Sequence, residues 1–202
     1  MRLSEYSNID SFLDAAIQMH AKSPHRSEDV DRTFFGAVAR EAIPGLVLEF
    51  GVATGYTFNC IADSFPDQTV YGFDWFQGLP EDWRADHLKG HFACDVPAVR
   101  DNAELIIGLF DDTLPKFMQE HLGPAVSFVH LDADLYSSTV TILNNIESRV
   151  VKGTILLFDE LEYPGDYKDH EYKAFREFLE RTGHDCEYFG TRGRETVAFR
   201  IV

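Results

Sequence analysis

Apolar residues recur along this chain with two alternating periods, which predicts alternating strands and helices. Five short apolar runs have the length and composition of buried strands: 46–50, 69–73, 103–108, 126–131 and 154–158. Apolar residues that return every three or four positions predict helices over 9–21, 28–42, 56–65, 111–121, 135–150 and 168–181. Two strand-like runs close the chain, 186–190 and 196–202, and the turn residues at 191–194 predict a hairpin between them.

This order of elements predicts an α/β fold. Five β/α alternations followed by an antiparallel pair indicate one doubly wound, mostly parallel seven-stranded sheet with a C-terminal antiparallel hairpin. The 202 residues fit a single domain, with residues 1–44 as an N-terminal helical lid segment and residues 45–202 as the catalytic α/β core. On such a sheet, ligands bind outside the carboxyl ends of the strands, so the residues that follow each strand are the first candidates for a site.

Charge and cysteine content exclude several classes of function. The chain has 18 Lys and Arg against 34 Asp and Glu, and a net charge of −16 repels both nucleic acid and anionic membranes. The three cysteines are widely spaced and form no C-x-x-C, which argues against a disulfide scaffold and against a zinc site. No apolar run approaches membrane-spanning length and no signal segment opens the sequence, so we expect a cytoplasmic protein. The terminal strands could pair within one chain or contribute to a homo-oligomer.

A glycine turn and the start of a helix follow the first strand. Gly51 and Gly55 can adopt positive φ without strain and let a ligand approach bare backbone, as in the cradles that bind nucleotide-like ligands. A dinucleotide fingerprint would require glycine at Ala53 and Tyr56, so the loop is not typical of a dinucleotide site. Glu49, at the end of the strand, suits a ligand with an amino group or a positive centre. The alternative is a plain turn of any α/β domain.

The next two strands end in residues that suit a nucleoside. Asp74 closes the second strand, where a carboxylate can accept hydrogen bonds from both ribose hydroxyls. Gly108, Leu109 and Phe110 close the third strand, where an adenine could pack against the backbone and the Phe110 ring. A turn-forming aspartate and an ordinary core phenylalanine are the alternatives.

Acidic residues crowd the ends of the fourth and fifth strands. Asp132 and Asp134 follow the fourth strand, and Asp159 and Glu160 follow the fifth. We expect these strands to be neighbours, so Asp132, Asp159 and Glu160 would meet at one end of the sheet. Crowded like charges are costly unless a cation or a donor compensates them, and oxygen ligands suit Mg²⁺ or Ca²⁺ rather than zinc. Asp134 could instead cap the helix that follows.

Residues 75–100 follow neither period and contain several aromatic side chains. A loop of this length in a compact domain is usually functional. Its exposed aromatics, Trp75, Trp83 and Phe92, could dock a partner, although packing within the loop is the more common use of such residues.

Four sequence blocks resemble those of the macrocin O-methyltransferase (TylF-type) family: 73–80, 108–115, 130–139 and 153–160. The glycine loop resembles motif I of the class I S-adenosylmethionine (SAM) methyltransferases. The resemblance implies a Rossmann-like methyltransferase fold, SAM as methyl donor and a small molecule with a sugar or related hydroxyl as acceptor. In many members three acids hold a divalent cation, which here would be Asp132, Asp159 and Glu160, with Mg²⁺ as the expected ion. Position 160 is Glu where the family often has Asp or Asn, and the stretch before the first strand is short.

The resemblance also implies a set of site residues. Donor contacts are expected from Glu49, Gly51, Val52, Ala53, Thr54, Gly55, Thr57, Asp74, Trp75, Gly108, Leu109, Phe110 and Asp132. Asp132 is a catalytic candidate, and Asp134 or His170 could accept the proton of the acceptor hydroxyl. A metal ion would orient the hydroxyls and lower the acceptor's pKa. The rival interpretations are an NAD(P)-dependent oxidoreductase and a catalytically silent methyltransferase-like binding module.

Overall fold

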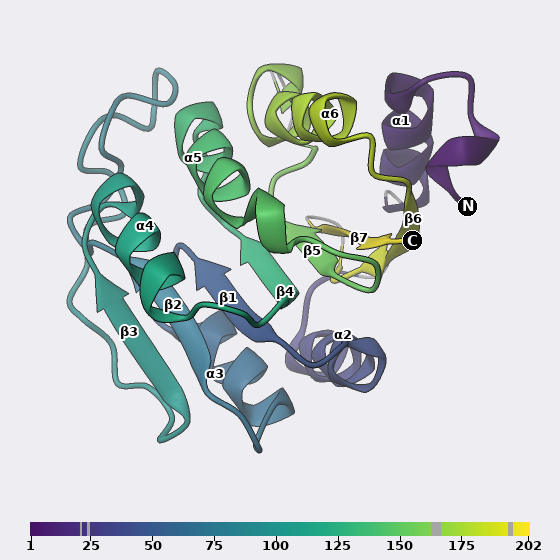
Figure 1. Cartoon of the computed structure of the whole chain (residues 1–202). Coiled ribbons are helices and arrows are strands. Elements are labelled where there is room, and N and C mark those ends of the chain that lie inside the picture. The colour runs from purple at the N-terminus through teal and green to yellow at the C-terminus, as the bar shows by residue number, and fades with distance from the viewer. Residues whose placement is uncertain (21, 24, 163–166, 194–195) are drawn as a thin grey trace.

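Seven strands form one sheet in the order β3-β2-β1-β4-β5-β7-β6 (Figure 1). The computed structural model describes residues 1–20, 22–23, 25–162, 167–193 and 196–202. The strands are β1 (Leu46–Phe50), β2 (Val70–Asp74), β3 (Ala103–Ile107), β4 (Val126–Leu131), β5 (Ile155–Phe158), β6 (Cys186–Thr191) and β7 (Val197–Ile201). The first five strands run parallel, whereas β7 is antiparallel to both β5 and β6. The predicted fold class is therefore confirmed.

Six α-helices cover the two faces of this sheet. They are α1 (Ile9–His20), α2 (Glu28–Glu41), α3 (Tyr56–Ser64), α4 (Phe110–Glu120), α5 (Tyr136–Ile146) and α6 (Glu171–Thr182). Short 3₁₀ turns lie at Leu3–Glu5, Glu147–Arg149 and Tyr167–Asp169. Every residue of β1, β4 and β5 is buried, which explains why these strands are mostly apolar, with Glu49, Ser127 and His130 as the polar exceptions.

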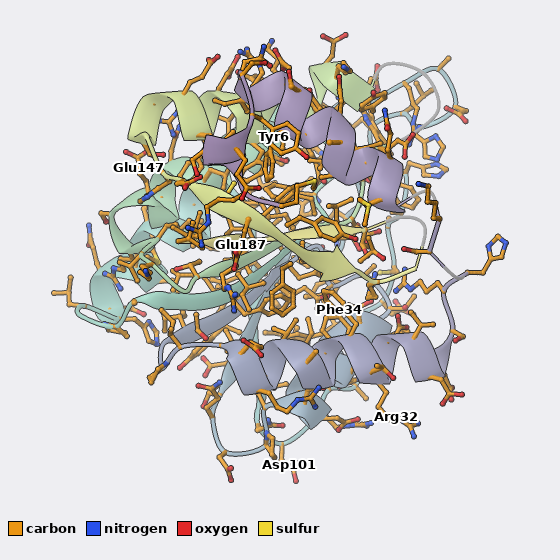
Figure 2. The ribbon with its side chains drawn as sticks, turned by 90° about the vertical axis from the view of Figure 1, so that its right-hand side faces the viewer. Tyr6, Arg32, Phe34, Asp101, Glu147 and Glu187 are labelled. Carbon is orange, nitrogen blue, oxygen red and sulfur yellow. The ribbon has the colours of Figure 1, made fainter. Side chains whose placement is uncertain are left out.

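Two hydrophobic cores result, one on each face of the sheet. Apolar side chains of α1, α4, α5 and α6 form the larger core, and those of α2 and α3 form the other (Figure 1). In Figure 2, Phe34 points from α2 toward the β6 edge of the sheet, where its ring centroid lies 6.3 Å from that of Phe189. Tyr6 lies beside α1 and contacts Phe12 edge to face at 5.5 Å.

The described part of residues 1–44 packs onto the sheet and its helices. Phe12, Leu13 and Phe35 are fully buried in the two cores, and no described residue of this segment lines the main cavity. The described part of this segment thus contributes to both cores, and its role as a lid stays a prediction. Among the described residues, no helix is long and apolar enough to cross a bilayer.

Element boundaries differ from the predicted ones by a few residues at most. The helix expected over 135–150 ends at Ile146 and continues as a 3₁₀ turn, and the helix expected over 168–181 begins at Glu171. Of the predicted hairpin turn, residue 194 lies outside the described residues, as does 163–166 in the acidic loop after β5.

Candidate functional site

A cavity of about 530 Å³ opens at the carboxyl ends of the parallel strands. Its walls come from the segments that follow five strands: Gly51 and Ala53 after β1, Asp74 and Trp75 at the end of β2, Gly108–Phe110 after β3, Asp132–Asp134 after β4, and Glu160 after β5. The sequence predicted that these strand ends would form one site, and their residues do line one cavity. The physical reason is that the right-handed crossovers of a doubly wound sheet bring the carboxyl ends of the parallel strands to the same edge.

The glycine loop after β1 lies tightly against the end of β4. Gly51 has φ +89°, and a Cβ at this position would lie 1.9 Å from the carbonyl oxygen of Asp132. No other residue fits there without moving the backbone. Gly55 has φ +79° and forms the N-cap of α3. Between them Ala53 also takes a positive φ of 45°, which is uncommon for a residue with a Cβ.

Asp74 fixes the loop in this conformation. One carboxylate oxygen accepts the backbone N–H of Ala53 at 2.8 Å, and the other accepts that of Phe76 at 2.7 Å. A carboxylate offers about four lone-pair sites, so each oxygen of Asp74 can accept one more hydrogen bond. Because Asp74 also lines the cavity, it can serve the loop and a bound ligand together.

Several predicted donor contacts do not line the cavity. Val52 and Gly55 are buried, Thr54 is exposed, and the Thr57 hydroxyl accepts hydrogen bonds from Arg26 Nη2 at 2.9 Å and Arg192 Nη1 at 3.2 Å. Glu49 is fully buried and does not line the cavity either. Successive side chains of a strand point to opposite faces, and since Leu48 and Phe50 belong to the larger core, Glu49 points toward α2 and α3.

On that face Glu49 begins a buried chain of charged groups. His130 Nδ1 donates to Glu49 Oε1 at 2.8 Å, and His130 Nε2 lies 3.4 Å from Asp159 Oδ1. Arg192 Nη2 donates to the same Asp159 oxygen at 2.7 Å. Glu49, His130 and Arg192 are all inaccessible to solvent. Each charge in this chain therefore depends on its neighbours for compensation.

The pKa values follow from these contacts. Burial disfavours the charged ring of His130, but hydrogen bonds to Asp159 and Glu49 outweigh burial and raise the pKa of His130. Burial also disfavours the Asp159 carboxylate, yet the hydrogen bond from His130 and the charge of Arg192 lower the pKa of Asp159 to about 2. Asp159 is therefore ionised, and its charge favours the protonated ring of His130, whereas burial raises the pKa of Glu49.

The three acids predicted to hold a metal are only partly brought together. Ligand atoms of His130, Asp132 and Asp159 lie within 4.8 Å of one another, and Glu160 does not belong to that group. Glu160 Oε2 lies 3.6 Å from Arg84 Nη2 instead. Burial, followed by the charge of Asp159, raises the pKa of Asp132 well above its usual range.

This donor set does not fit a divalent cation. Metal ligands must be deprotonated and must direct a lone pair at the ion. Asp159 Oδ1 already accepts from a guanidinium and an imidazolium, and both nitrogens of His130 face carboxylates. The crowded acids are compensated, as the sequence required, but the compensating groups are arginine and histidine side chains.

Asp134, one of the two predicted proton acceptors, lies at the cavity. It lines the cavity, has φ +57°, and does not cap α5, whose N-cap is Leu135. Burial, together with the charge of Asp159, raises the pKa of Asp134 to about 7. A carboxylate with this pKa is a competent base near neutral pH.

His170, the other predicted base, lies away from the cavity wall. It is the N-cap residue of α6, and its ring centroid is 5.9 Å from that of Trp83. The next residue, Glu171, is fully buried and accepts the backbone N–H of Glu160 at 3.1 Å. Sequence reasoning missed Glu171 because an acid in the first turn of a helix is an ordinary feature.

Residues 75–100 cover the cavity from one side. Trp75 and Phe92 line it together with Glu81, whose Oε1 accepts a hydrogen bond from the Ser137 hydroxyl at 2.5 Å. Arg84 stacks on the ring of Trp83, with its guanidinium carbon 3.4 Å from the ring centroid. The aromatics of this loop thus pack within the loop and around the cavity.

Comparisons with known proteins agree with this geometry. Residues 48–161 match a family described as a methyltransferase domain. That match covers more than half of the chain, so the chain belongs to this family.

The chain is also similar to individual proteins. It is 28% identical over 145 residues to the 8-demethyl-8-(2,3-dimethoxy-alpha-L-rhamnosyl)-tetracenomycin-C 4'-O-methyltransferase of Streptomyces olivaceus, which covers 61% of this chain and 55% of that protein. The chain thus spans about half the length of this curated relative. Its fold is similar to that of a calicheamicin methyltransferase, with a TM-score of 0.71, 22% identity and coverage of 98% and 96% of the two chains. An O-methyltransferase from Bacillus cereus in complex with SAH gives a TM-score of 0.57 at 15% identity, covering 98% and 94%.

Proposed function

We propose that this methyltransferase takes its methyl group from SAM and transfers it to a hydroxyl of a small, sugar-like molecule. The cavity at the strand ends carries the proposal, because it joins a nucleoside-compatible wall at Asp74 to a proton acceptor at Asp134. The Streptomyces relative is a 4'-O-methyltransferase of a rhamnosyl-bearing tetracenomycin, which supports a sugar hydroxyl as the acceptor.

One end of the cavity suits the donor. SAM, when bound, supplies a methyl group on a positively charged sulfur. Asp74 can accept hydrogen bonds from ribose hydroxyls with its remaining lone pairs, and the backbone at Gly51 and Ala53 leaves room for close approach. The Phe110 ring, held edge to face against Phe50 at 5.4 Å, can pack against the adenine.

The other end suits a polar acceptor. Asp134, Glu81, Ser137, Ser138 and Thr141 line it. Their oxygens can bind several hydroxyls of one molecule, which favours a sugar over a flat apolar ring. The cavity volume of about 530 Å³ is within the usual range for sites that bind small molecules. This volume gives no reason to expect an oligosaccharide or a nucleic acid as the acceptor.

Asp134 acts as the base in this reaction. The acceptor oxygen forms a bond to the methyl carbon while the carbon–sulfur bond breaks, and the hydroxyl proton passes to the Asp134 carboxylate. The products are the methyl ether, S-adenosylhomocysteine and protonated Asp134, so charge and atoms balance. Alignment of the acceptor oxygen with the methyl carbon supplies most of the rate enhancement. We prefer Asp134 to His170 because only Asp134 lines the cavity.

Two further parts of the proposal concern the metal requirement and the cellular location. The assistance of Mg²⁺ stays a prediction of the family resemblance, and we leave it out of the reaction because Asp159 and Glu160 face arginines. Cys60, Cys94 and Cys186 are free thiols, which suits the reducing cytoplasm that we propose as the location. A homo-oligomer remains compatible with the fold.

The donor is tested by thermal shift and calorimetry with SAM and S-adenosylhomocysteine. Both should raise the melting temperature, because a ligand that binds only the native state stabilises it. Asp74→Ala should weaken binding, whereas Asp101→Ala, an exposed residue, should not. No shift with either ligand would favour the catalytically silent module, and a difference spectrum with NADH would favour the oxidoreductase.

The acceptor is tested with radiolabelled SAM and a panel of small hydroxyl compounds. Deoxysugars, nucleotide sugars and sugar-bearing natural products should accept label, and catechols should accept little. Label on catechols alone would contradict the sugar assignment while leaving the donor assignment intact.

A further inference from the structure

We propose that two arginines, Arg192 and Arg84, take the place of a divalent cation among the acids after β4 and β5, so that methyl transfer by this protein requires no metal ion. The inference rests on the proposed methyl transfer. It adds which groups neutralise the acid cluster, by which we mean Asp132, Asp159 and Glu160.

Arg192 is a fixed internal cation. It follows β6 in the hairpin with β7, has no solvent exposure, and donates from Nη2 to Asp159 Oδ1 at 2.7 Å. Its other nitrogens are also held: Nη1 donates to Thr57 Oγ1 at 3.2 Å, and Nε lies 3.8 Å from Asp31 Oδ1. The guanidinium carbon lies 5.4 Å from the ring centroid of Phe35. Contacts from three different segments, α2, α3 and the end of β5, therefore hold this charge beside Asp159.

Arg84 has the corresponding position at Glu160. It reaches in from the loop 75–100, and its Nη2 lies 3.6 Å from Glu160 Oε2. Its guanidinium stacks on Trp83, and the side chains of Arg84 and Glu160 are only 16% and 22% exposed. Screening by solvent is therefore incomplete. Glutamate is one methylene longer than aspartate, and this length lets the carboxylate at position 160 extend toward the loop.

A divalent cation would have to displace these contacts. Mg²⁺ binds carboxylate oxygens at about 2.1 Å. An ion at that distance from Asp159 Oδ1 would compete with Arg192 for the same lone pairs and would be repelled by its charge. Both ring nitrogens of His130 already face carboxylate oxygens, Nδ1 at 2.8 Å from Glu49 Oε1 and Nε2 at 3.4 Å from Asp159 Oδ1.

Arg192 is thus a positioning residue. It does not line the cavity, but it holds Asp159, whose charge raises the pKa values of Asp132 and Asp134. Arg84 performs a second task, because its ion pair links the loop over the cavity to the end of β5. Together they give the acid cluster its compensation without an exchangeable ion.

The first test compares protein stripped with EDTA and protein supplied with Mg²⁺ or Mn²⁺. Stripped protein should transfer label from SAM at a rate within about twofold of the supplied protein, and electron paramagnetic resonance should detect no Mn²⁺ bound at one per chain. Loss of turnover that Mg²⁺ restores, or stoichiometric Mn²⁺ binding abolished by Asp132→Asn, would overturn the proposal. SAM affinity is measured by calorimetry in the same samples, so failure of the donor assignment is seen separately.

The second test removes each cation. Arg192→Gln and Arg84→Gln should each strengthen Mn²⁺ binding by about tenfold or more, because the acids lose a partner charge. Arg84→Gln alters a loop and is expected to fold even where Arg192→Gln does not. Arg100→Gln is the matched control, since Arg100 pairs with the exposed Asp63 and should leave Mn²⁺ binding unchanged. Unchanged Mn²⁺ binding in the folded variants would show that the arginines do not stand in for a metal.

Discussion

The two ends of the cavity are built from different material. The donor end is made of backbone: Gly51 and Ala53 form its loop, and two main-chain N–H groups hold Asp74. The acid cluster beside the cavity is held by side chains, because Asp159 contacts His130 and Arg192, which come from other segments of the chain. Local backbone geometry can be read from a motif, whereas paired charges depend on which distant segments the fold brings together. The following predictions test this contrast.

Removal of the buried cation should have the largest effect on stability. Arg192→Met leaves the largely buried Asp159 carboxylate with His130 as its remaining partner, and we expect a loss of about 3 kcal/mol in unfolding free energy. Urea denaturation measures it. The double variant with Asp159→Asn should recover part of the loss, because the carboxylate that lost its arginine is gone. Equal losses in single and double variants would mean that the pair is not coupled.

The same pair gives stability a pH dependence. The pKa of Asp159 is lowered to about 2 in the folded chain, below the usual 3.8. A lowered pKa stabilises the fold above the unfolded value, so this contribution is present above about pH 4 and is lost as the pH falls toward 2. Denaturation at a series of pH values should show this loss in the native chain and a smaller one in Asp159→Asn.

Substitution in the glycine loop should have the next largest effect. Gly51→Ala places a Cβ 1.9 Å from the Asp132 carbonyl oxygen at a positive φ, and we expect a loss of about 3 kcal/mol together with weaker SAM binding. Gly123→Ala is the matched control, since Gly123 has φ +110° and no atom within 4 Å of its Cβ position. The control reports the strain of a positive φ alone, about 1 kcal/mol. Similar losses in both variants would refute the close approach of the loop to β4.

The base should be visible in the rate. Asp134→Asn should lower turnover by about a hundredfold with little change in SAM affinity. In the native enzyme turnover should rise with pH through about 7, because only the deprotonated Asp134 can accept the proton and its pKa is raised to about 7. If turnover of the Asp134→Asn variant still rises with pH through about 7, the rise belongs to the titration of another group.

The smallest predicted effect is on donor affinity. Asp74→Asn keeps an oxygen acceptor but loses the charge, and we expect SAM to bind about tenfold more weakly, by about 1.4 kcal/mol. Calorimetry gives the value. An unchanged affinity would mean that Asp74 serves only the loop.

The order and type of the elements could be predicted from the sequence, and so could the backbone-built end of the cavity. Gly51, Ala53, Asp74 and the segment Gly108–Phe110 all line the cavity as expected. They could be predicted because a residue directly after a parallel strand lies at the carboxyl edge of the sheet wherever the strand is placed.

Other expected donor contacts failed to reach the cavity for a local reason that the pattern does not encode. A motif fixes the position of Glu49 along the chain, but not which face of the sheet its side chain takes. In the structure Glu49 points to the α2 and α3 side, where it meets His130, and the Thr57 hydroxyl in the first turn of α3 accepts a hydrogen bond from Arg26. A fully buried strand such as β1 carries no polar face from which the direction could be read.

The sequence by itself determined that the strand ends would carry acids and that something must compensate them. Only the tertiary structure decided what compensates them. Asp159 and Arg192 are 33 residues apart, and Thr57 and Arg192 are 135 apart, so no local pattern links them. Charge pairing acts through space over a few ångströms, and a chain with 18 basic residues contains too many possible partners for sequence alone to choose among. The fold makes the choice by placing the β6–β7 hairpin beside β5.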